Sequence, residues 1–208
     1  MLVKQIYDQY LIPPNLQKHM LRVAALSLIL SENWKKGKLD KEPIVLACVF
    51  HDMANIIKFD FNKPLLFKEE ENKIDYWKKI QKEVIQKYGT NVHLATFKIC
   101  REIGLPQKVL DIIKKLDWNN TLKILENQDY ESVIPIYGDM RIGPFGIMLL
   151  QDRIDNLATR NNKFDFHILK KAAETLEETL QKNLSINLNG ITNPQLENRF
   201  DELLKLEI

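Results

Sequence analysis

The chain contains an unbroken apolar run that is closed by a histidine and an aspartate, Ile44-Val45-Leu46-Ala47-Cys48-Val49-Phe50-His51-Asp52. The surrounding pattern places this run in a predicted helix from about Lys41 to Ile57. A helix that is apolar on every side is typical of the centre of a helical bundle. We therefore expect this segment to be the most buried element of the fold.

The remaining segments are also helical in pattern. Apolar residues recur at spacings of three and four, strand-like alternation is weak, and the chain has only seven glycines. Further helices are predicted at residues 2–10, 15–33, 68–88, 106–116, 119–127, 132–141, 147–161, 165–183 and 194–206, and one more begins at Thr90 or Asn91 and ends at Gly104. The sequence predicts an all-α, compact multi-helix bundle. It should form one domain over residues 1–208, with its core at about 10–160 and C-terminal helices at 165–207 packing on that core.

The overall composition argues against several classes of protein. Hydrophobic residues make up 45% of the chain and charged residues 28%, which is the balance of a folded globular domain. Thirty basic and 28 acidic residues leave a net charge of +2, so nucleic acid is not an expected partner. The composition leaves open a small-molecule partner and the association of identical chains.

The cysteines and the N-terminus bear on the cellular location. Cys48 and Cys100 lie in apolar stretches and form no CxxC pair, which favours free thiols in a reducing compartment. The N-terminus lacks the apolar run of a signal peptide, and no later stretch approaches about 18 uncharged apolar residues. We expect a cytoplasmic protein with no membrane partner.

Two of the four histidines fall on predicted core helices. His19 shares a helix face with Leu16, and His51 follows Ala47 at helical spacing, so both rings should point inward. Taken alone, each is most simply a buried core histidine. Asp52 changes this interpretation, because a carboxylate next to an apolar run is costly to bury without a partner. A divalent metal ion held by His51 and Asp52 would be such a partner.

Three blocks of the sequence resemble the HD superfamily of metal-dependent phosphohydrolases. They are YLIPPNLQKHMLRVA (10–24), FHDMANIIKFDF (50–61) and YGDMRIGPFGIMLLQDRIDNLATR (137–160). The hallmark of that superfamily is a helical histidine, then an adjoining His-Asp pair, then a distant aspartate, and the order is the same here. The resemblance implies an HD-domain helical bundle.

The resemblance implies four ligands for a divalent metal ion: His19, His51, Asp52 and Asp139. Asp152 and Asp155 compete with Asp139 for the role of the distant aspartate. We prefer Asp139 because it follows the apolar residues 133–136, whereas ion pairs with nearby arginines such as Arg153 would satisfy the other two. The alternative for Asp139 is an ordinary carboxylate at a helix end.

The resemblance also implies hydrolysis of a phosphate ester, such as a nucleotide, by a metal-activated water. The candidate catalytic residues are Asp52, Lys58, Asn55 and Arg22. Asp52 would assist proton removal, and Lys58 and Arg22 would neutralise phosphate charge, although both side chains could instead extend to solvent. His93, in the first turn of a predicted helix, is either an additional ligand or substrate contact or a surface residue. No role is expected for His167.

Two points concern the ion and its use. Histidine ligands favour a transition metal, so Mn, Co, Fe, Ni or Zn is expected ahead of Mg. Some HD nucleotidases place a glutamate three residues after the HD aspartate, where this chain has Asn55, and an amide cannot usefully exchange a proton. The alternative function is therefore a degenerate HD module that binds a nucleotide or partner without catalysis. A purely structural helical protein would hold no metal at all.

Overall fold

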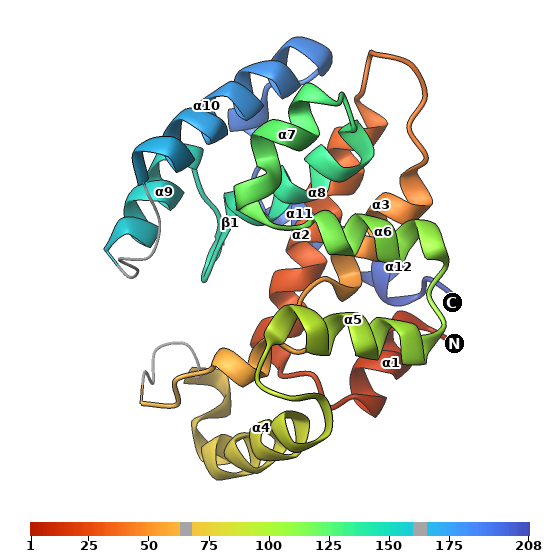
Figure 1. Cartoon of the computed structure of the whole chain (residues 1–208), viewed down its shortest axis with the longest axis vertical. Helices are drawn as coiled ribbons and strands as arrows, with labels where there is room; N and C mark the ends of the chain where they lie inside the picture. Colours follow the sequence, from red (N-terminus) through yellow and green to blue (C-terminus); the bar gives the residue numbers. More distant parts are fainter. Residues whose placement is uncertain (63–67, 160–165) are drawn as a thin grey trace.

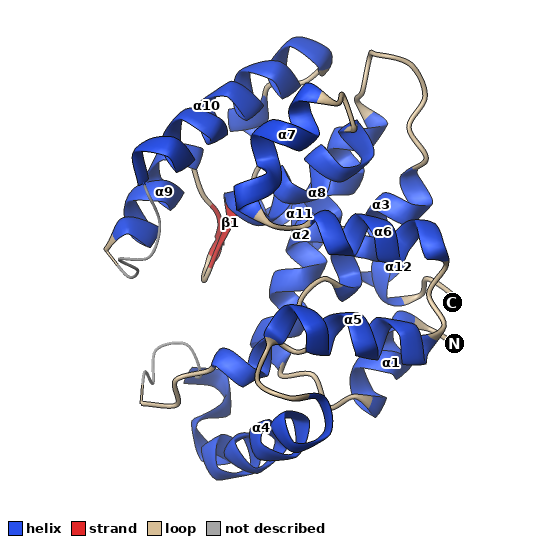
Figure 2. Ribbon diagram, in the orientation of Figure 1, coloured by secondary structure: helices blue, strands red, loops and turns tan. Residues whose placement is uncertain are grey.

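The computed structural model describes residues 1–62, 68–159 and 166–208, without the side chains of residues 68, 69, 71 and 166–168. The described chain is a helical bundle with one β-hairpin, whose two strands have two residues each (Figure 1; Figure 2). Its α-helices are α1 (Val3–Gln9), α2 (Pro14–Glu32), α3 (Lys41–Phe50), α4 (Ile74–Tyr88), α5 (Val92–Ile103), α6 (Gln107–Lys115), α7 (Thr121–Glu126), α8 (Tyr130–Arg141), α9 (Leu150–Ala158), α10 (Phe166–Asn183), α11 (Asn193–Glu197) and α12 (Phe200–Leu204). Short 3₁₀ helices are η1 (Asn55–Lys58), η3 (Lys68–Lys73), η4 (Trp118–Asn120) and η5 (Leu188–Gly190), and β1 (Ile142–Gly143) pairs with β2 (Gly146–Ile147). The predicted all-α class is confirmed.

Helix α2 lies at the centre of the bundle, with α3 and α8 packed along it. The run Ile44–Phe50 on α3 has at most 6% of its surface exposed, as expected for a central helix. One apolar core extends from Val3 in α1 to Leu203 in α12. The two chain ends also meet, since the Met1 ammonium donates to the Ile208 carbonyl at 2.6 Å. The C-terminal helices α11 and α12 therefore share the core of the bundle.

Helix α3 ends at Phe50, seven residues before the predicted end at Ile57. The sequence could not show this stop because a hydrogen bond to another helix accompanies it. The backbone N–H of Ala54 donates to the Thr96 hydroxyl on α5 at 3.1 Å. The His51 ring donates from Nδ1 to the Cys48 carbonyl at 2.7 Å. The chain then tightens into the 3₁₀ helix η1. His51 and Asp52 therefore stand on a turn just beyond a helix end.

Other predicted helices also have different bounds. The segment 68–88 divides into η3 and α4, the segment 119–127 begins with η4, and the segment 194–206 divides into α11 and α12. The segment 147–161 begins in the β-hairpin, and α9 starts only at Leu150. Gly146, at φ +136, makes the hairpin turn possible and lies so close to Asn193 that a Cβ would meet its Oδ1 at 2.1 Å. The hairpin is thus anchored to α11.

None of the helices in the described parts of the chain combines the length and apolarity that a membrane span requires.

Candidate metal centre

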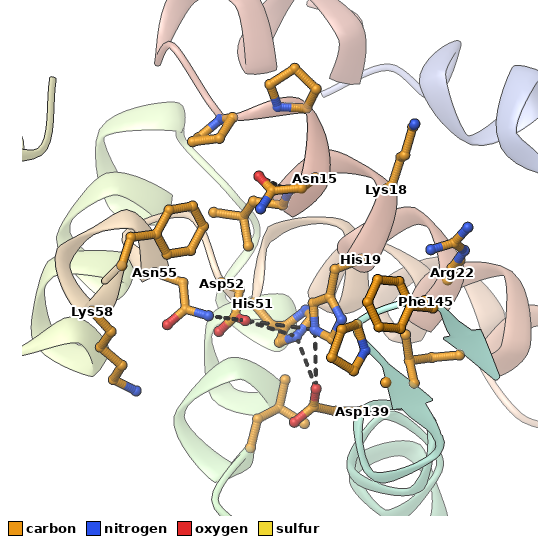
Figure 3. A pocket seen from close by; sticks show the side chains of 18 of the residues that line it. Asn15, Lys18, His19, Arg22, His51, Asp52, Asn55, Lys58, Asp139 and Phe145 are labelled. Carbon is orange, nitrogen blue, oxygen red and sulfur yellow. Dashed lines mark hydrogen bonds and ion pairs between the residues drawn. The ribbon is translucent and has the colours of Figure 1, made fainter. Parts of the chain in front are cut away.

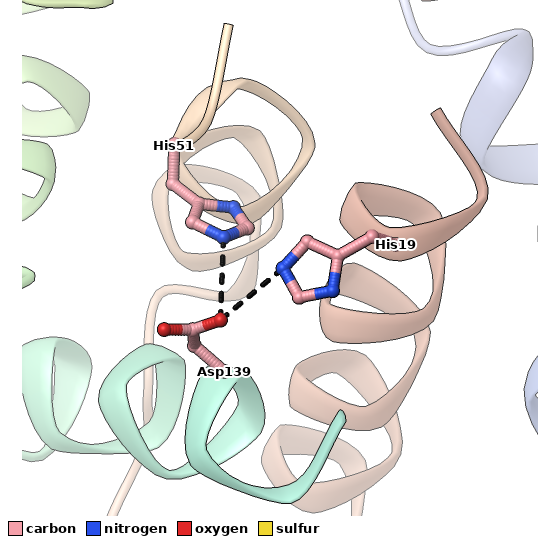
Figure 4. A group of neighbouring side chains, drawn as sticks. All are labelled: His19, His51 and Asp139. Carbon is pink, nitrogen blue, oxygen red and sulfur yellow. Dashed lines mark ion pairs between the residues drawn. The ribbon is translucent and has the colours of Figure 1, made fainter. Parts of the chain in front are cut away.

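Three helices bring two histidines and one aspartate together. His19 lies on the second turn of α2, His51 directly follows α3, and Asp139 lies on the last turn of α8 (Figure 4). Asp139 Oδ1 is 3.2 Å from His19 Nε2 and 3.6 Å from His51 Nε2. Among the described residues these three side chains form one group of mutually close ligand atoms. Residues far apart in sequence thus converge on one point.

The ring of His51 is held in a fixed orientation. Its Nδ1 lies 2.7 Å from the carbonyl oxygen of Cys48, which can only accept, so Nδ1 carries a proton. Nε2 then faces Asp139 and His19. The side chain is only 5% exposed, so water has little access to this atom. Nε2 is buried and makes no hydrogen bond to any described residue. A buried nitrogen left without a partner is costly, and a metal ion would satisfy it.

Asp52 lies next to the two histidines, slightly farther from them than Asp139 does. Its Oδ2 is 3.7 Å from His19 Nε2 and 3.8 Å from His51 Nε2, and it accepts a hydrogen bond from Asn55 Nδ2 at 2.8 Å. It does not belong to the group of mutually close ligand atoms that His19, His51 and Asp139 form. Asp52 is therefore placed to bind an ion from the edge of the cluster.

The donor set fits a divalent transition metal. Metal–ligand bonds of about 2.1 Å meeting at roughly 90–110° place two ligand atoms about 3.0–3.4 Å apart. The distances of 3.2 Å and 3.6 Å around Asp139 Oδ1 lie close to this range. His51 also directly follows the C-terminus of α3, and Asp139 lies in the last turn of α8, so both are close to the negative end of a helix dipole, which favours a cation.

Opposite charges on the histidines and the carboxylates attract one another within the cluster. Burial acts to lower the pKa of His51, but the neighbouring carboxylates of Asp52 and Asp139 outweigh burial and raise it to about 9. Burial likewise acts to raise the pKa of Asp139, but His19 and His51 hold it well below its usual value. Burial raises the pKa of Cys48 and of Cys100 to about 12, so neither thiol offers a thiolate ligand near neutral pH.

The cluster lies in a cleft of about 780 Å³. Its lining comprises Pro13, Pro14, Asn15, Leu16, Lys18, His19, Arg22, His51, Asp52, Asn55, Lys58, Phe59, Glu70, Trp77, His93, Ile113, Leu116, Asp117, Trp118, Asp139, Ile142, Gly143, Pro144, Phe145, Arg153 and Leu157. Figure 3 shows Asn55 and Lys58 on one side of the histidines, with Arg22 and Phe145 on the other. The cleft is therefore both charged and aromatic beside the candidate ligands.

The cationic candidates in the cleft differ in how they are held. Lys58 is exposed and makes no hydrogen bond or ion pair with any other residue in the described ranges. Arg22 pairs with Glu197 on α11 at 2.7 Å, and its Nε is buried without a hydrogen-bond partner in the described chain. His93 is exposed and lines the cleft, but it lies outside the close group of ligand atoms. Of Lys58 and Arg22, Lys58 is thus the one whose side chain is not tied to another described residue.

The competing aspartates are placed elsewhere. Asp152 and Asp155 are exposed on α9 and do not belong to the cleft lining. Asp155 instead accepts a hydrogen bond from Gln151 at 2.8 Å. The side chain of His167 lies outside the described residues. Of the three aspartates weighed for the distant position, Asp139 is the one beside the histidines.

The comparisons with known proteins give one match. The family model for the HD domain matches residues 16–118, which include His19, His51 and Asp52. The chain belongs to the HD-domain superfamily. Neither the search of curated proteins nor the search of solved structures finds a match. HD domains are generally metal-dependent hydrolases, and the cluster of His19, His51 and Asp139 could hold such a metal.

The matched part of the HD domain ends at Trp118, before Asp139. Trp118 donates its indole N–H to Asp139 Oδ2 at 3.0 Å. Sequence reasoning did not select Trp118, because a hydrogen bond between residues in different helices leaves no spacing pattern. It also did not select Phe145, which is 74% exposed at the tip of the hairpin. The block of residues 137–160 contains Phe145, but no apolar periodicity marks a residue of this kind.

Proposed function

We propose that this HD-domain chain is a metal-dependent phosphohydrolase that acts on a small phosphate ester, such as a nucleotide. The observation that carries the proposal is the group formed by His19, His51 and Asp139, whose ligand atoms face one another in the wall of a cleft. We propose Asp52, at the edge of this group, as a fourth ligand. The ion is expected to be Mn, Co, Fe, Ni or Zn ahead of Mg.

Bound in this group, a divalent ion would supply Lewis-acid activation of water and of a phosphoryl oxygen. In hydrolysis, the water oxygen forms a bond to phosphorus, the P–O bond of the ester breaks, and the leaving oxygen gains a proton. In the proposed reaction Asp52 would accept the proton of the attacking water, and the hydrogen bond from Asn55 to its Oδ2 would help to orient it. In the same proposal Lys58 would neutralise charge on the phosphate, and Arg22 and His93 line the same cleft.

The shape and lining of the cleft support a nucleotide-sized substrate. Small-molecule pockets commonly enclose about 300–1,000 Å³, and this cleft has about 780 Å³. Phe59, Trp77, Trp118 and Phe145 contribute aromatic rings to its lining. Such rings can stack on a flat base while the metal centre holds the phosphate. This is our reason for preferring a nucleotide over a purely aliphatic phosphate ester.

Asn55 favours a second candidate, a degenerate HD module that binds a nucleotide without turning it over. Its amide donates to Asp52 and cannot exchange a proton at neutral pH. If no other group supplies acid or base catalysis, binding would occur without product. The two candidates share the metal site and differ only in turnover.

The first experiment measures metal content and phosphate release on the same preparations. The wild-type protein is incubated with Mn²⁺, desalted and analysed by mass spectrometry for bound metals, and is then screened for phosphate release from a panel of nucleotides. We expect about one ion per chain, since the described residues form one cluster of this kind. Asp139→Ala should lose this metal, whereas Asp152→Ala, which changes an exposed aspartate outside the cleft, should retain it.

The outcomes separate the candidates. Metal-dependent phosphate release that Asp52→Ala and Asp139→Ala both abolish supports the phosphohydrolase. Metal binding with ligand-dependent stabilisation and no product supports the binding module. Equal metal content in wild type and Asp139→Ala would overturn the proposed site.

A further inference from the structure

The two oxygens of the Asp139 carboxylate have different partners. Oδ1 faces His19 Nε2 at 3.2 Å and His51 Nε2 at 3.6 Å. Oδ2 instead accepts the indole N–H of Trp118 at 3.0 Å. An indole N–H only donates and stays neutral, so it cannot bind a metal ion itself. Its partner oxygen is thereby turned away from the two histidines.

Trp118 is held firmly enough to set this orientation. It begins η4, and the Asp117 carboxylate caps this short helix by accepting the backbone N–H of Asn119 at 2.9 Å. The Trp118 carbonyl accepts the hydroxyl of Thr121 at 2.7 Å, and Thr121 is completely buried. The ring itself is half-buried against the apolar core. Hydrogen bonds thus hold the backbone on both sides of Trp118, and the apolar core packs against its ring.

We propose that Trp118 is a positioning residue of the metal centre, which through its indole N–H holds Asp139 with Oδ1 alone facing the ion. This inference rests on the metal site of the proposed function. A free carboxylate can bind an ion through one oxygen or through both. Because Trp118 occupies Oδ2, Asp139 uses a single oxygen, and one coordination position stays open for water or substrate.

The removal of the donor is tested with Trp118→Phe, which keeps an aromatic ring and loses the N–H. Hydrogen-bond partners of metal ligands typically contribute a factor of about 10–100 in metal affinity. We therefore expect Trp118→Phe to bind Co²⁺ about tenfold or more weakly. We also expect a changed visible absorption spectrum of the Co²⁺ form, because Asp139 becomes free to bind through both oxygens.

Trp34→Phe is the matched control. The Trp34 indole also donates a hydrogen bond, to the Lys36 carbonyl at 2.7 Å, but this residue does not line the cleft. The control likewise keeps an aromatic ring and loses an indole N–H, and we expect no change in its Co²⁺ affinity or spectrum. If Trp118→Phe matches Trp34→Phe in both measurements, the proposal for Trp118 is wrong while the metal site stands. If the wild type binds no Co²⁺, the metal site and the proposal fail together.

A measurement on the unmodified side chain covers the case in which Trp118→Phe does not fold. The three tryptophans give three indole N–H signals in an ¹H–¹⁵N spectrum, and Trp34→Phe and Trp77→Phe leave the third signal to Trp118. Mn²⁺ should broaden the Trp118 signal selectively, and Zn²⁺ should leave it visible and slow to exchange with solvent. Loss of that exchange protection on Zn²⁺ binding would show that the hydrogen bond breaks, and would overturn the proposal. Absence of any effect of Mn²⁺ on this signal would overturn it as well.

Discussion

Lys58 and Arg22 are both cations of the cleft, but only one is tied to another side chain. Arg22 is held by Glu197 at 2.7 Å, and so its removal would also leave a carboxylate on α11 without its partner. Lys58 has no such partner in the described chain. A substitution at Lys58 therefore tests phosphate binding without disturbing a contact between helices.

We expect Lys58→Ala to raise the KM for a phosphate ester and to leave the metal content unchanged. A charge-assisted hydrogen bond contributes about 1.5–3 kcal/mol, so an increase of about tenfold or more is expected. Steady-state kinetics at saturating Mn²⁺ would measure it. Lys79→Ala, on the exposed face of α4, is the control. An unchanged KM in Lys58→Ala would remove this lysine from the substrate site.

Single residues of the cluster could be predicted because burial constrains them. His51 and Asp52 stood out as polar residues that end an apolar run, and the structure brings both to the cleft with Asp139. Trp118 and Glu197 could not be found in this way. Their partners lie 21 and 175 positions away in the sequence, and no periodicity links such distant pairs.

Helix α8 positions Asp139, and the N-terminal end of this helix is capped by Asp129. Asp129 accepts hydrogen bonds from the Ser132 backbone at 3.2 Å and from Lys115 Nζ at 2.7 Å. Burial acts to raise the pKa of Asp129, but Lys115 and Ser132 outweigh it and lower the pKa below its ordinary value. The charged form is therefore the one that stabilises the fold.

The lowered pKa gives Asp129→Asn a pH-dependent effect. Stability from Asp129 is fully present above the ordinary carboxyl pKa of about 3.9 and is lost as the pH falls through the lowered value. At pH 7 we expect Asp129→Asn to be less stable by about 0.5–1 kcal/mol, since the charge also favours a helix N-terminus. Urea unfolding at several pH values measures this difference. It should vanish in strong acid, and a difference that is the same at every pH would contradict a role for the charge of Asp129.

Gly138 allows α8 to approach α2 closely. A Cβ at this position would lie 2.7 Å from Ser27 Oγ and 3.3 Å from the Val23 carbonyl. Gly138→Ala should therefore push apart the two helices that carry Asp139 and His19. Overpacking of this kind costs about 1–3 kcal/mol, offset by about 1 kcal/mol of helix propensity.

We expect Gly138→Ala to weaken Co²⁺ binding more than it lowers the free energy of unfolding of the metal-free protein. Calorimetric titration and denaturant unfolding would provide both values. Gly190→Ala is the matched control, because its Cβ would meet nothing closer than 3.9 Å. Equal metal affinity in both variants would show that the spacing of α2 and α8 does not set the site.

The elements were predictable where a local signal marks their ends. Asn91, one of the two starts predicted with Thr90, caps α5 through its side chain, and Gly104 ends the same helix at its predicted end in the left-handed conformation. The predicted end of α3 was wrong, and no local signal marks the true end. There the Ala54 N–H donates a hydrogen bond to Thr96, which lies on a different helix. The hairpin was missed because its strands have only two residues each, too few for a pattern of alternation.

At the scale of the whole molecule, the candidate ligands join parts of the chain that no local contact connects. His19, His51 and Asp139 come from α2, α3 and α8, which pack together at the centre of the core. The helical pattern predicted such a core. It could not predict that α2 packs against α3 and α8, because that choice depends on how the apolar faces of separate helices fit together. An ion bound by all three residues would stabilise the folded state, since the unfolded chain cannot hold the three side chains together.

This arrangement predicts a large thermal shift on metal binding. At a free metal concentration 100-fold above Kd, a single site adds about 2.7 kcal/mol to the stability of the folded protein. For a chain of this size, that corresponds to a rise in Tm of roughly 5–10 °C. Differential scanning calorimetry with Co²⁺ or Mn²⁺ would measure the shift, and a chelator should reverse it. Asp139→Ala should show no shift while Asp152→Ala responds like the wild type, because only Asp139 links α8 to the two histidines. An equal rise in Tm in Asp139→Ala would mean that the stabilising ion binds elsewhere on the molecule.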